Sequence, residues 1–492
     1  MPPAPRVATA VLLSTGAGAD LRVLLVQRSP ALRFFGGFWA FPGGAMEDAD
    51  RACGEHAALS CALRELLEET ALGHALLGVS RAEARAWLAA FTPEGPPPAW
   101  REALRRVADS GRYHPVCRIT TPAHVAIRYA TDFVQLHCDR AEEFELDAAE
   151  LVAGEYLAPA DAVARWRRGE LPIAPPALLL LELLAAHGVP AFRAAAARVA
   201  DSLEAGEFHP VRFSPGVFTA PVPTPTLPPA TTTNCYILGE RELYVIDPAA
   251  VDAAHRDKLI RKLESLCAEG ATLRGILLTH HHPDHVGSAA PLSRHFGVPL
   301  HAHALCHARL TDSDYLRGRA LEDGDRLALG TAPDGSPDWQ IEVLHTPGHS
   351  RDHLCYVESR YRAAIVGDML STVSTIVIDP PEGHMATYLQ SLERLLSIPL
   401  TTIYPAHGPS QRDGHALIRQ YLEHRRARER QILEALGDAP RTLAALLAEA
   451  YGDVAPAVHG AASRSLLAGL QKLEEEGRAA QRDGGWVRTA QT

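Results

Sequence analysis

The sequence predicts a multidomain α/β protein, and three observations support this class. The chain has 492 residues, and at roughly 100–200 residues per domain this length favours two to four domains. Two long regions mix short strand-like apolar runs with longer helical runs. Hydrophobic residues make up 47% of the chain and charged residues 22%, a balance that lets each soluble domain bury a core.

The first region, residues 5–190, contains both kinds of run. Its apolar stretches VATAVLL, RVLLVQR and AIRYATDFVQLHC are typical of strands. The stretches HAALSCALRELLEETAL and PPALLLLELLAAH place apolar residues three or four positions apart, which predicts helices. A Pro-rich loop, FTPEGPPPAW, separates them. We therefore expect one mixed α/β domain here.

The rest of the chain divides where the composition changes. Residues 191–209 form an Ala- and Arg-rich amphipathic run, which predicts a helical connector. A Pro- and Thr-rich stretch then opens a second α/β region at 210–412. Residues 415–492 are mostly helical and end in RAAQRDGGWVRT, which predicts two short strands around a Gly-Gly turn.

Charge and cysteine usage restrict the compartment and the partners. The net charge of −11 gives no general attraction toward nucleic acid or anionic membrane. The eight cysteines include no CxxC pair and are read as buried thiols in a reducing compartment. The N-terminal residues make a poor signal peptide, and the apolar stretch 177–186 is too short to span a bilayer. We expect a cytoplasmic protein without a membrane partner and leave its oligomeric state open.

The stretch ILLTHHHPDHVG is the strongest chemical signal in the chain. The histidines follow a short apolar strand, at the end of the strand where open α/β sheets place their sites. Because alternate side chains of an extended backbone share a face, His280 and His282 point the same way. Pro283 then turns the chain, so Asp284 and His285 can reach a second point nearby. One tract could therefore supply ligands to two metal ions.

The alternative reading of this tract is a polar, solvated loop. Three further residues in the same region argue against it, because each follows an apolar run that predicts a strand or turn. They are His349 in VLHTPGH, Asp368 in IVGD and His407 in IYPAHG. Imidazole and carboxylate ligands suit Zn²⁺, with Mn²⁺ or Fe²⁺ as alternatives.

Together with Asp247 in YVIDPAA, these motifs resemble the metallo-β-lactamase superfamily over residues 210–412. The resemblance implies an αβ/βα sandwich with two Zn²⁺ (or Mn²⁺ or Fe²⁺) ions. It assigns one ion to His280, His282 and His349, the other to Asp284, His285 and His407, and a bridging position to Asp368. Asp247 would support the site from behind, and Asp284 would also take part in catalysis. The histidines outside this motif pattern are not expected to be ligands: His281, His301, His303, His307 and His345.

The chemistry implied by such a centre is hydrolysis. Two ions roughly 3.5–4 Å apart can share a water molecule and lower its pKa toward neutrality. The motif does not choose between thioester, lactam, lactone and phosphodiester substrates.

The C-terminal segment resembles the winged helix of the lactamase-B2-like and glyoxalase II-like group. Some relatives in that group cleave single-stranded RNA. Nucleic acid is therefore an alternative partner, with Arg425, Arg426, Arg428 and Arg430 as the candidate contacts. The reading we favour, given the acidic chain, is that this small module packs on its own domain or on a partner.

A second site is indicated upstream, in CALRELLEETAL. On a helix, Glu65, Glu68 and Glu69 lie on one face, since residues three and four apart are neighbours. A charged surface helix is the ordinary reading of such a pattern. The preceding loop, FWAFPGGAMED, argues against that reading. If the glutamates bind a cation, oxygen-only ligation suits Mg²⁺ or Mn²⁺.

The loop and helix together resemble the Nudix hydrolases over residues 5–190, which implies an αβα sandwich. Arg64, Glu65, Leu66, Glu68, Glu69 and Leu72 match the family motif. Ala71 replaces the motif glycine, and thirteen residues instead of seven separate the first acid, Asp50, from Arg64. In this resemblance the three glutamates hold Mg²⁺ or Mn²⁺, Glu65 and Glu68 are catalytic, and Arg64 orients a carboxylate.

The stretch LLVQRSPALRFFGGFWAFPGG resembles the extra signature of coenzyme A-cleaving Nudix enzymes, with Val26 in place of a threonine. It implies substrate contacts from Arg28, Arg33, Gly43, Gly44 and Arg64. Because the sequence ends in AQT, we do not expect a C-terminal peroxisomal signal.

We expect a bifunctional metal-dependent hydrolase with small-molecule substrates. The Nudix-like part would cleave a diphosphate in coenzyme A, acyl-CoA or a nucleoside diphosphate derivative, and the lactamase-like part a thioester or other ester. One alternative is RNA and nucleotide metabolism, with the lactamase-like part as a single-strand endoribonuclease. A second is a Nudix-like sensor coupled to a winged-helix nucleic-acid binder.

Overall fold

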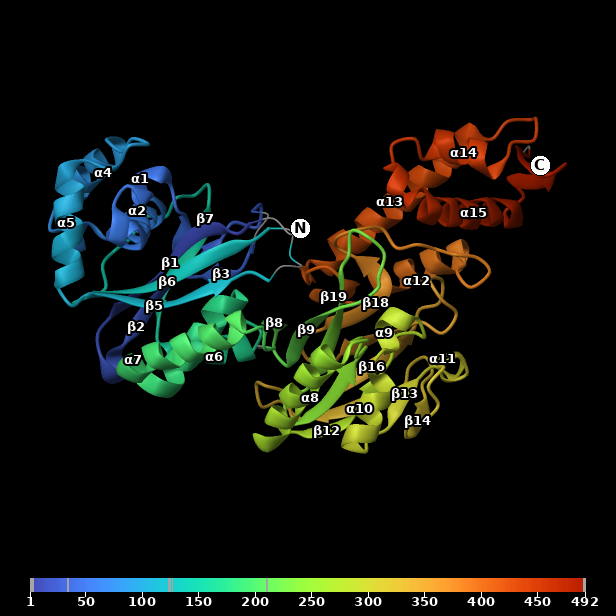
Figure 1. Ribbon diagram of the computed structural model, residues 1–492, viewed down its shortest axis with the longest axis horizontal. Coiled ribbons are helices and arrows are strands. Elements are labelled where there is room, and N and C mark those ends of the chain that lie inside the picture. The colour runs from blue at the N-terminus through green and yellow to red at the C-terminus, as the bar shows by residue number, and fades with distance from the viewer. Residues whose placement is uncertain (1–3, 33–34, 123–124, 126, 209–210, 490–492) are drawn as a thin grey trace. The chain divides into compact units, whose positions relative to one another are not determined.

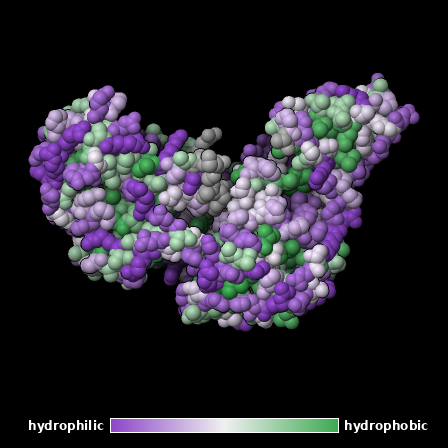
Figure 2. All heavy atoms as spheres, in the orientation of Figure 1, coloured by the Kyte–Doolittle hydropathy of each residue, from purple (hydrophilic) through white to green (hydrophobic). Residues whose placement is uncertain are grey.

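The computed structural model describes residues 4–32, 35–122, 125, 127–208 and 211–489. It divides into two compact units, Met1–Pro215 and Gly216–Thr492. Each unit is built on mixed β-sheet covered by helices (Figure 1), so the predicted multidomain α/β class is confirmed. Figure 2 shows hydrophilic side chains over much of the face that each unit presents.

The first unit contains a seven-stranded sheet of order β3-β2-β1-β6-β5, with β4 paired to β1 and β7 paired to β2. Strands β1 and β6 run parallel over their whole length, while the other pairs are antiparallel. The strands are β1 (Arg6–Thr15), β2 (Arg22–Arg28), β3 (Trp39–Ala40), β4 (Gly43–Ala45), β5 (Tyr113–Thr120), β6 (Tyr129–Cys138) and β7 (Leu151–Leu157).

Alternation along β1 explains how the sheet is covered on both faces. Val11 and Leu13 point into one buried cluster, which includes residues of α2 and α5, and Leu12 points into the other, which includes residues of α6 and α7. This is the expected αβα sandwich. Its helices are α1 (Asp48–Arg51), α2 (Ala57–Thr70), α3 (His74–Leu77), α4 (Arg81–Ala89), α5 (Pro98–Asp109), α6 (Pro159–Arg167) and α7 (Pro175–Glu204).

Helix α7 continues through the segment predicted to be a connector. Gly188 interrupts its helical backbone, and Phe192 and Ala196 beyond that break are buried in the same cluster as Leu178 and Leu181. By length and composition alone α7 could cross a membrane. Its buried face, however, forms part of the hydrophobic core of this unit.

The second unit contains two sheets that face each other. One has the order β14-β13-β12-β11-β10-β9 and the other β15-β16-β17-β18-β19-β20. The strands are β9 (Val217–Pro223), β10 (Thr232–Leu238), β11 (Glu242–Ile246), β12 (Thr272–Leu277), β13 (Leu300–Ala302), β14 (Arg317–Ala320), β15 (Arg326–Gly330), β16 (Trp339–His345), β17 (Leu354–Glu358), β18 (Ala363–Ser371), β19 (Thr402–His407) and β20 (Gln411–Arg412). Strand β8 (Val211–Ser214) precedes them at the junction of the units.

Helices cover the outer faces of both sheets and complete the predicted αβ/βα arrangement. Helices α8 and α10 contact β12, while α12 and α13 share a buried cluster with residues of β17 and β18. The helices of this part are α8 (Ala253–Ala268), α9 (Pro283–Val286), α10 (Ala289–Phe296), α11 (Ala304–His307), α12 (Met385–Ser397) and α13 (Gly414–Ala435).

The C-terminal segment forms a small winged-helix module around its own hydrophobic cluster. It contains α14 (Leu443–Ala450), α15 (His459–Glu475), β21 (Ala479–Arg482) and β22 (Gly485–Arg488). The two predicted strands pair as a hairpin, but the turn is formed by Asp483 and Gly484 at positive φ and not by two glycines, because Gly485 already belongs to β22. Helix α15 also contacts α12, and Ala468 is buried in the cluster below β17 and β18.

Candidate metal centre and carboxylate site

Strand ends deliver the predicted ligands of the second unit to one place. The tract from His280 to His285 follows β12, Asp368 lies in β18, His407 ends β19, and His349 lies in the loop after β16. Two sets of side chains each bring one ligand atom per residue within 4.8 Å of one another. The first set is His280, His282, His349 and Asp368; the second is Asp284, His285 and His407.

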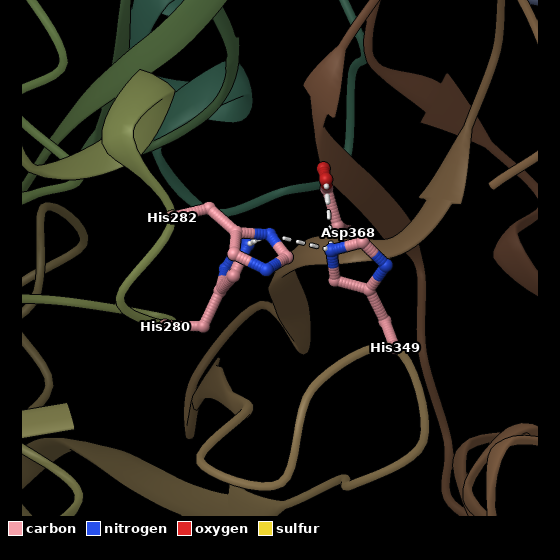
Figure 3. Close-up of side chains that lie close together, drawn as sticks. All are labelled: His280, His282, His349 and Asp368. Atoms are coloured by element: carbon pink, nitrogen blue, oxygen red, sulfur yellow. Dashed lines mark hydrogen bonds and ion pairs between the residues drawn. The ribbon is translucent and has the colours of Figure 1, made fainter. Parts of the chain in front are cut away.

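In the first set, the imidazoles of His280 and His349 converge on the Nδ1 atom of His282 (Figure 3). This atom lies 2.9 Å from Nε2 of His280 and 3.0 Å from Nε2 of His349. Oδ2 of Asp368 lies 3.4 Å from the same Nε2 of His349. Burial, reinforced by the neighbouring imidazoles, lowers the pKa of His280 well below its ordinary value, which keeps the ring neutral. A neutral ring can offer a lone pair to a cation.

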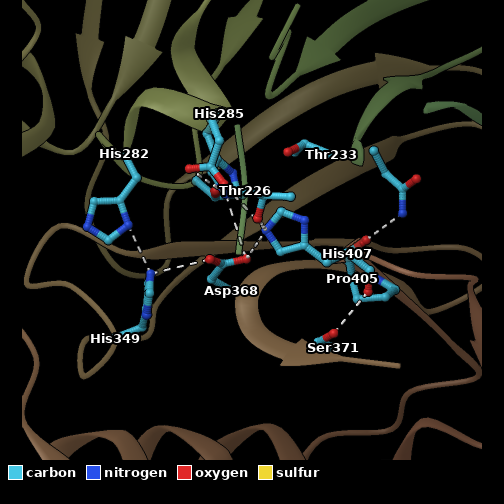
Figure 4. A network of polar contacts seen from close by, with 12 residues as sticks. Thr226, Thr233, His282, His285, His349, Asp368, Ser371, Pro405 and His407 are labelled. Atoms are coloured by element: carbon cyan, nitrogen blue, oxygen red, sulfur yellow. Dashed lines mark hydrogen bonds and ion pairs between the residues drawn. The ribbon is translucent and has the colours of Figure 1, made fainter. Parts of the chain in front are cut away.

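The second set meets the other oxygen of the same aspartate (Figure 4). Oδ1 of Asp368 lies 3.3 Å from Nε2 of His407 and 3.7 Å from Nε2 of His285. Asp284 is close by, with Oδ2 3.6 Å from Nε2 of His407. Asp368 therefore faces both sets, one oxygen to each, which is the position that the sequence predicts for a bridging ligand.

The far nitrogen of three rings is held by an acceptor. Nδ1 of His349 donates to the carbonyl of Val377 at 2.9 Å, and Nδ1 of His407 donates to the carbonyl of Thr232 at 3.0 Å. Nδ1 of His285 donates to Oδ2 of Asp247 at 2.9 Å. With the proton on Nδ1, each Nε2 presents a lone pair to the centre, and such contacts fix the tautomer and the ring orientation of metal-binding histidines.

Asp247 fixes the positions of Thr279 and His285 through hydrogen bonds. It is 1% exposed, and besides His285 it accepts the amide N–H of Thr279 on Oδ1 at 2.7 Å and the Thr279 hydroxyl on Oδ2 at 2.6 Å. Since Thr279 is the residue before His280, one carboxylate fixes the start of the histidine tract and one ring within it. The support role expected for Asp247 thus has a direct structural basis.

The residues present fit a pair of divalent cations. Among the described residues, Nε2 of His285 and Oδ1 of Asp368 are buried without a hydrogen-bond partner, which costs about 1–3 kcal/mol for an ordinary polar group. Burial alone would lower the pKa of His285, but Asp368 and Asp247 raise it well above its ordinary value. Without a cation, Nε2 of His285 therefore carries a second proton, and a cation bound by imidazole and carboxylate would replace that proton.

The histidines predicted not to be ligands have other partners. His345 donates from Nε2 to the carbonyl of Arg351 at 2.9 Å, and its ring stacks on His303 with centroids 4.8 Å apart. His301 accepts the amide of Arg319, and His307 contacts the hydroxyl of Tyr315. His281 pairs through Nδ1 with Asp352 at 3.0 Å, and with Glu382 these two residues form a third cluster.

The carboxylate site of the first unit is organised by Arg64 on α2. Its guanidinium donates to Oδ2 of Asp50 at 3.0 Å, to Oε2 of Glu68 at 2.8 Å and to the carbonyl of Ala45 at 2.8 Å. Asp50 is fully buried and also accepts the hydroxyl of Ser60 at 2.9 Å. The thirteen-residue spacing folds as the end of α1, a short 3-10 turn and the start of α2, so Asp50 still reaches Arg64 and anchors it.

The glycines of β4 lie against the acidic face of α2. The amide of Gly43 donates to Oε2 of Glu69 at 2.8 Å, and a Cβ on Gly44 would meet the Glu65 carboxylate at 2.5 Å. Burial raises the pKa of Glu65 to about 7 and that of Glu69 to about 8, and it also raises the pKa of Glu68. A hard cation such as Mg²⁺ would compensate these crowded carboxylates.

The carboxylates of this site lie farther apart than the ligand atoms of the histidine sets do. Among the described residues, Glu65, Glu68 and Glu69 do not form a group within 4.8 Å as the histidine sets do. Arg28 ends β2 and lies close enough to help lower the pKa of Glu69. Arg33 lies outside the described residues.

Two contacts at the sites had no signal in the sequence. Oγ1 of Thr226 lies 3.4 Å from Nε2 of His407 (Figure 4), although the Pro- and Thr-rich loop that contains it reads only as a turn. Glu150 raises the pKa of Glu65 and Glu69, to which burial contributes most. It precedes β7, which pairs with β2, and the backbone amides of Glu145 and Asp147 donate to the carbonyls of Thr70 and Glu69 at the end of α2.

The second unit thus gathers imidazoles and carboxylates at two neighbouring points between its sheets, and the first unit has a carboxylate-rich helix beside two glycines. Comparison with known proteins identifies both. Residues 228–407 match the Metallo-beta-lactamase superfamily, 4–167 match the NUDIX domain, and 442–486 match the Beta-lactamase associated winged helix domain. Residues 4–167 therefore form a Nudix domain and residues 228–407 a metallo-β-lactamase domain, both of hydrolase families that imply divalent metal ions, and residues 442–486 form the associated winged helix.

Several curated relatives resemble part of the chain. The Lactamase-like protein adaB of Aspergillus niger is 29% identical over 42% of this chain and 58% of its own length. The Atrochrysone carboxyl ACP thioesterase of Claviceps purpurea is 29% identical over 45% and 67%. The Hydroxyacylglutathione hydrolase of Rhodopseudomonas palustris is 34% identical over 31% and 53%. The chain spans about three fifths of the length of the first curated relatives it matches.

Proposed function

We propose that the metallo-β-lactamase domain hydrolyses a thioester or related ester at a centre of two divalent cations. The observation that carries this proposal is the pair of ligand sets that share Asp368. Bound cations would polarise a carbonyl oxygen and lower the pKa of a water molecule. The relatives named as a thioesterase and as a hydroxyacylglutathione hydrolase support a thioester in preference to the other ester classes.

The residues of the centre would have different roles in binding the cations and in catalysis. His280, His282 and His349 would hold one cation, and Asp284, His285 and His407 the other. Asp368 would contribute one carboxylate oxygen to each of the two cation positions. The Asp284 side chain is 18% exposed against 11% for Asp368, so solvent reaches it more readily. We assign to Asp284 the acceptance of a proton from the attacking water.

The Nudix domain would cleave a diphosphate linkage, with coenzyme A or an acyl-CoA as substrate. Glu65, Glu68 and Glu69 would hold Mg²⁺ or Mn²⁺, which neutralises phosphate charge when bound. Arg64 fixes Glu68 and is itself fixed by Asp50. This part of the proposal is supported by the approach of Gly43 and Gly44 to the glutamates and by the coenzyme A-type signature in the sequence.

One substrate distinguishes the two activities. Full-length protein incubated with acyl-CoA and divalent metal should release an adenosine-containing product from the Nudix site and a free thiol from the other site. The variant Glu68→Gln should lose only the adenosine product, and His349→Ala only the thiol. Each variant is the control for the other. If acyl-CoA yields neither product, or if both variants react as the parent does, the proposal is wrong.

The RNA alternative has less support from the arginines of α13. Arg425 is 6% exposed and donates to the carbonyl of Ile376, while Arg428 makes two 2.8 Å contacts with Asp453. Arg426 pairs with Glu393 at 3.2 Å. These side chains already serve contacts within the second unit. A short single-stranded RNA belongs in the same assay, and cleavage that disappears in His282→Ala would favour the alternative.

A further inference from the structure

The backbone that orients His349 is itself held by the winged helix. The carbonyl of Val377 accepts the proton on Nδ1 of His349 at 2.9 Å. The residues on either side of Val377 are tied to two helices. The carbonyl of Ile376 accepts from Arg425 of α13, and the amide of Ile378 donates to Oγ of Ser465 on α15 at 3.3 Å.

These ties lie in the protein interior. Ile376 is 5% exposed, Ile378 is fully buried, and both Arg425 and Ser465 are 6% exposed. Water therefore cannot readily replace either hydrogen bond, and an amide left unpaired at Ile378 would be costly. A buried tie of this kind restricts the backbone more than a solvent-exposed one does.

Other residues of α15 near Ser465 also contact the segment around Val377. Ala468 is buried in one cluster with Ile376 and Ile378. Arg464 pairs with Asp379 at 3.1 Å, although both side chains are more than half exposed, so this pair contributes little. Ser465 is therefore the group on α15 that holds the segment at the residue next to Val377.

We propose that Ser465 is a positioning residue of the metal centre. It fixes Ile378 and thereby the Val377 carbonyl, which sets the tautomer and orientation of His349 at the first set of ligands. The winged helix would then be an integral support of the metal centre. This inference concerns how the chain binds metal and does not depend on which ester or thioester is hydrolysed.

The test is Co²⁺ binding to metal-free, full-length protein, followed by visible absorption and by competition with a chelator. In Ser465→Ala the Val377 carbonyl remains but is held less firmly, so one of two bound ions should lose up to about 10-fold in affinity, the lower end of the loss typical when such a partner is itself removed. The absorption bands of that ion should shift. Ser463→Ala is the matched control, because residues two apart on a helix do not share a face. Ser465→Thr keeps the hydroxyl and should restore the parent spectrum.

The outcomes separate cleanly. The inference is overturned if Ser465→Ala binds both ions with the affinity and spectrum of the parent. It is also overturned if both ions weaken equally while the melting temperature of the metal-free protein falls, since that result shows a general loss of structure. If the parent protein binds no Co²⁺, the proposed function fails as well, whereas a normal parent and an unaffected variant refute only the role of Ser465.

Discussion

Replacing Asp247 by asparagine should move the ring proton of His285 from Nδ1 to Nε2. Asp247 accepts three hydrogen bonds, and its Oδ1 must keep accepting the one from the Thr279 amide at 2.7 Å. In Asp247→Asn the oxygen would remain there and the NH₂ group would replace Oδ2, which faces Nδ1 of His285 at 2.9 Å. An NH₂ group donates, so Nδ1 must accept and the ring proton moves to Nε2. The nitrogen that faces Asp368 then has no lone pair for a cation.

The size of the effect follows from this geometry. Loss of a carboxylate that fixes a metal-binding histidine typically weakens metal affinity about 10- to 100-fold. At about 1.4 kcal/mol for each factor of ten, the binding free energy should fall by about 1.4–2.8 kcal/mol. Competition between metal-free protein and a fluorescent chelator for Zn²⁺ measures this directly. The ion held by His285 should weaken, and the ion held by His280 should change less.

Asp352→Asn is the matched control. Asp352 is also fully buried and also faces Nδ1 of a histidine, His281, at 3.0 Å. His281 belongs to neither of the two ligand sets that share Asp368, although with Asp352 and Glu382 it forms the third group of possible ligands. The control should therefore keep both Zn²⁺ affinities. Equal affinities in Asp247→Asn and the parent would refute the tautomer argument.

Three other predictions concern the Nudix site. Gly44→Ala would place Cβ 2.5 Å from the Glu65 carboxylate and should lower the rate of diphosphate cleavage by about 100-fold, with thioester hydrolysis in the same sample unchanged. Glu65 and Glu69 have folded pKa values of about 7 and 8, above the ordinary 4.5. At pH values between the ordinary pKa and the folded pKa of each glutamate, the folded state binds more protons than the unfolded state. The melting temperature of metal-free protein should therefore fall as the pH rises from about 5 to about 9. Added Mg²⁺ should reduce this slope, and a flat profile without metal would contradict the pKa shifts. Arg64→Lys keeps the charge but loses the fork that reaches Asp50 and Glu68, so denaturant titration should show a loss of about 2–3 kcal/mol; an unchanged midpoint would contradict that role.

The sequence predicted the parts of both sites that depend on local spacing. His280, His282, Asp284 and His285 lie within six residues, and their grouping follows from strand alternation and one turn. The class of each domain followed from motifs of the same local kind. His349, Asp368 and His407 could be assigned only through the resemblance, because no local rule brings three separate strand ends together.

The supporting contacts could not be predicted. Ser465 is a serine within an amphipathic helix, and only folding places it beside Ile378, 87 residues earlier. Asp50 has unusual spacing from Arg64, so its anchoring role appeared only once α1 and the following turn were seen to fold back. Such contacts depend on packing between distant elements, for which the sequence carries no periodic signal.

The two-sided placement of Asp368 has a consequence for how the protein would take up metal. Its Oδ2 faces His349 while Oδ1 faces His407 and His285. A cation on one side would immobilise the carboxylate and so prepare the other side before a second cation arrives. By thermodynamic reciprocity, removing either ion would loosen the remaining one to the same degree. Loss of one ion would then carry over in part to the other, while the ion whose own ligands are disturbed would still weaken more.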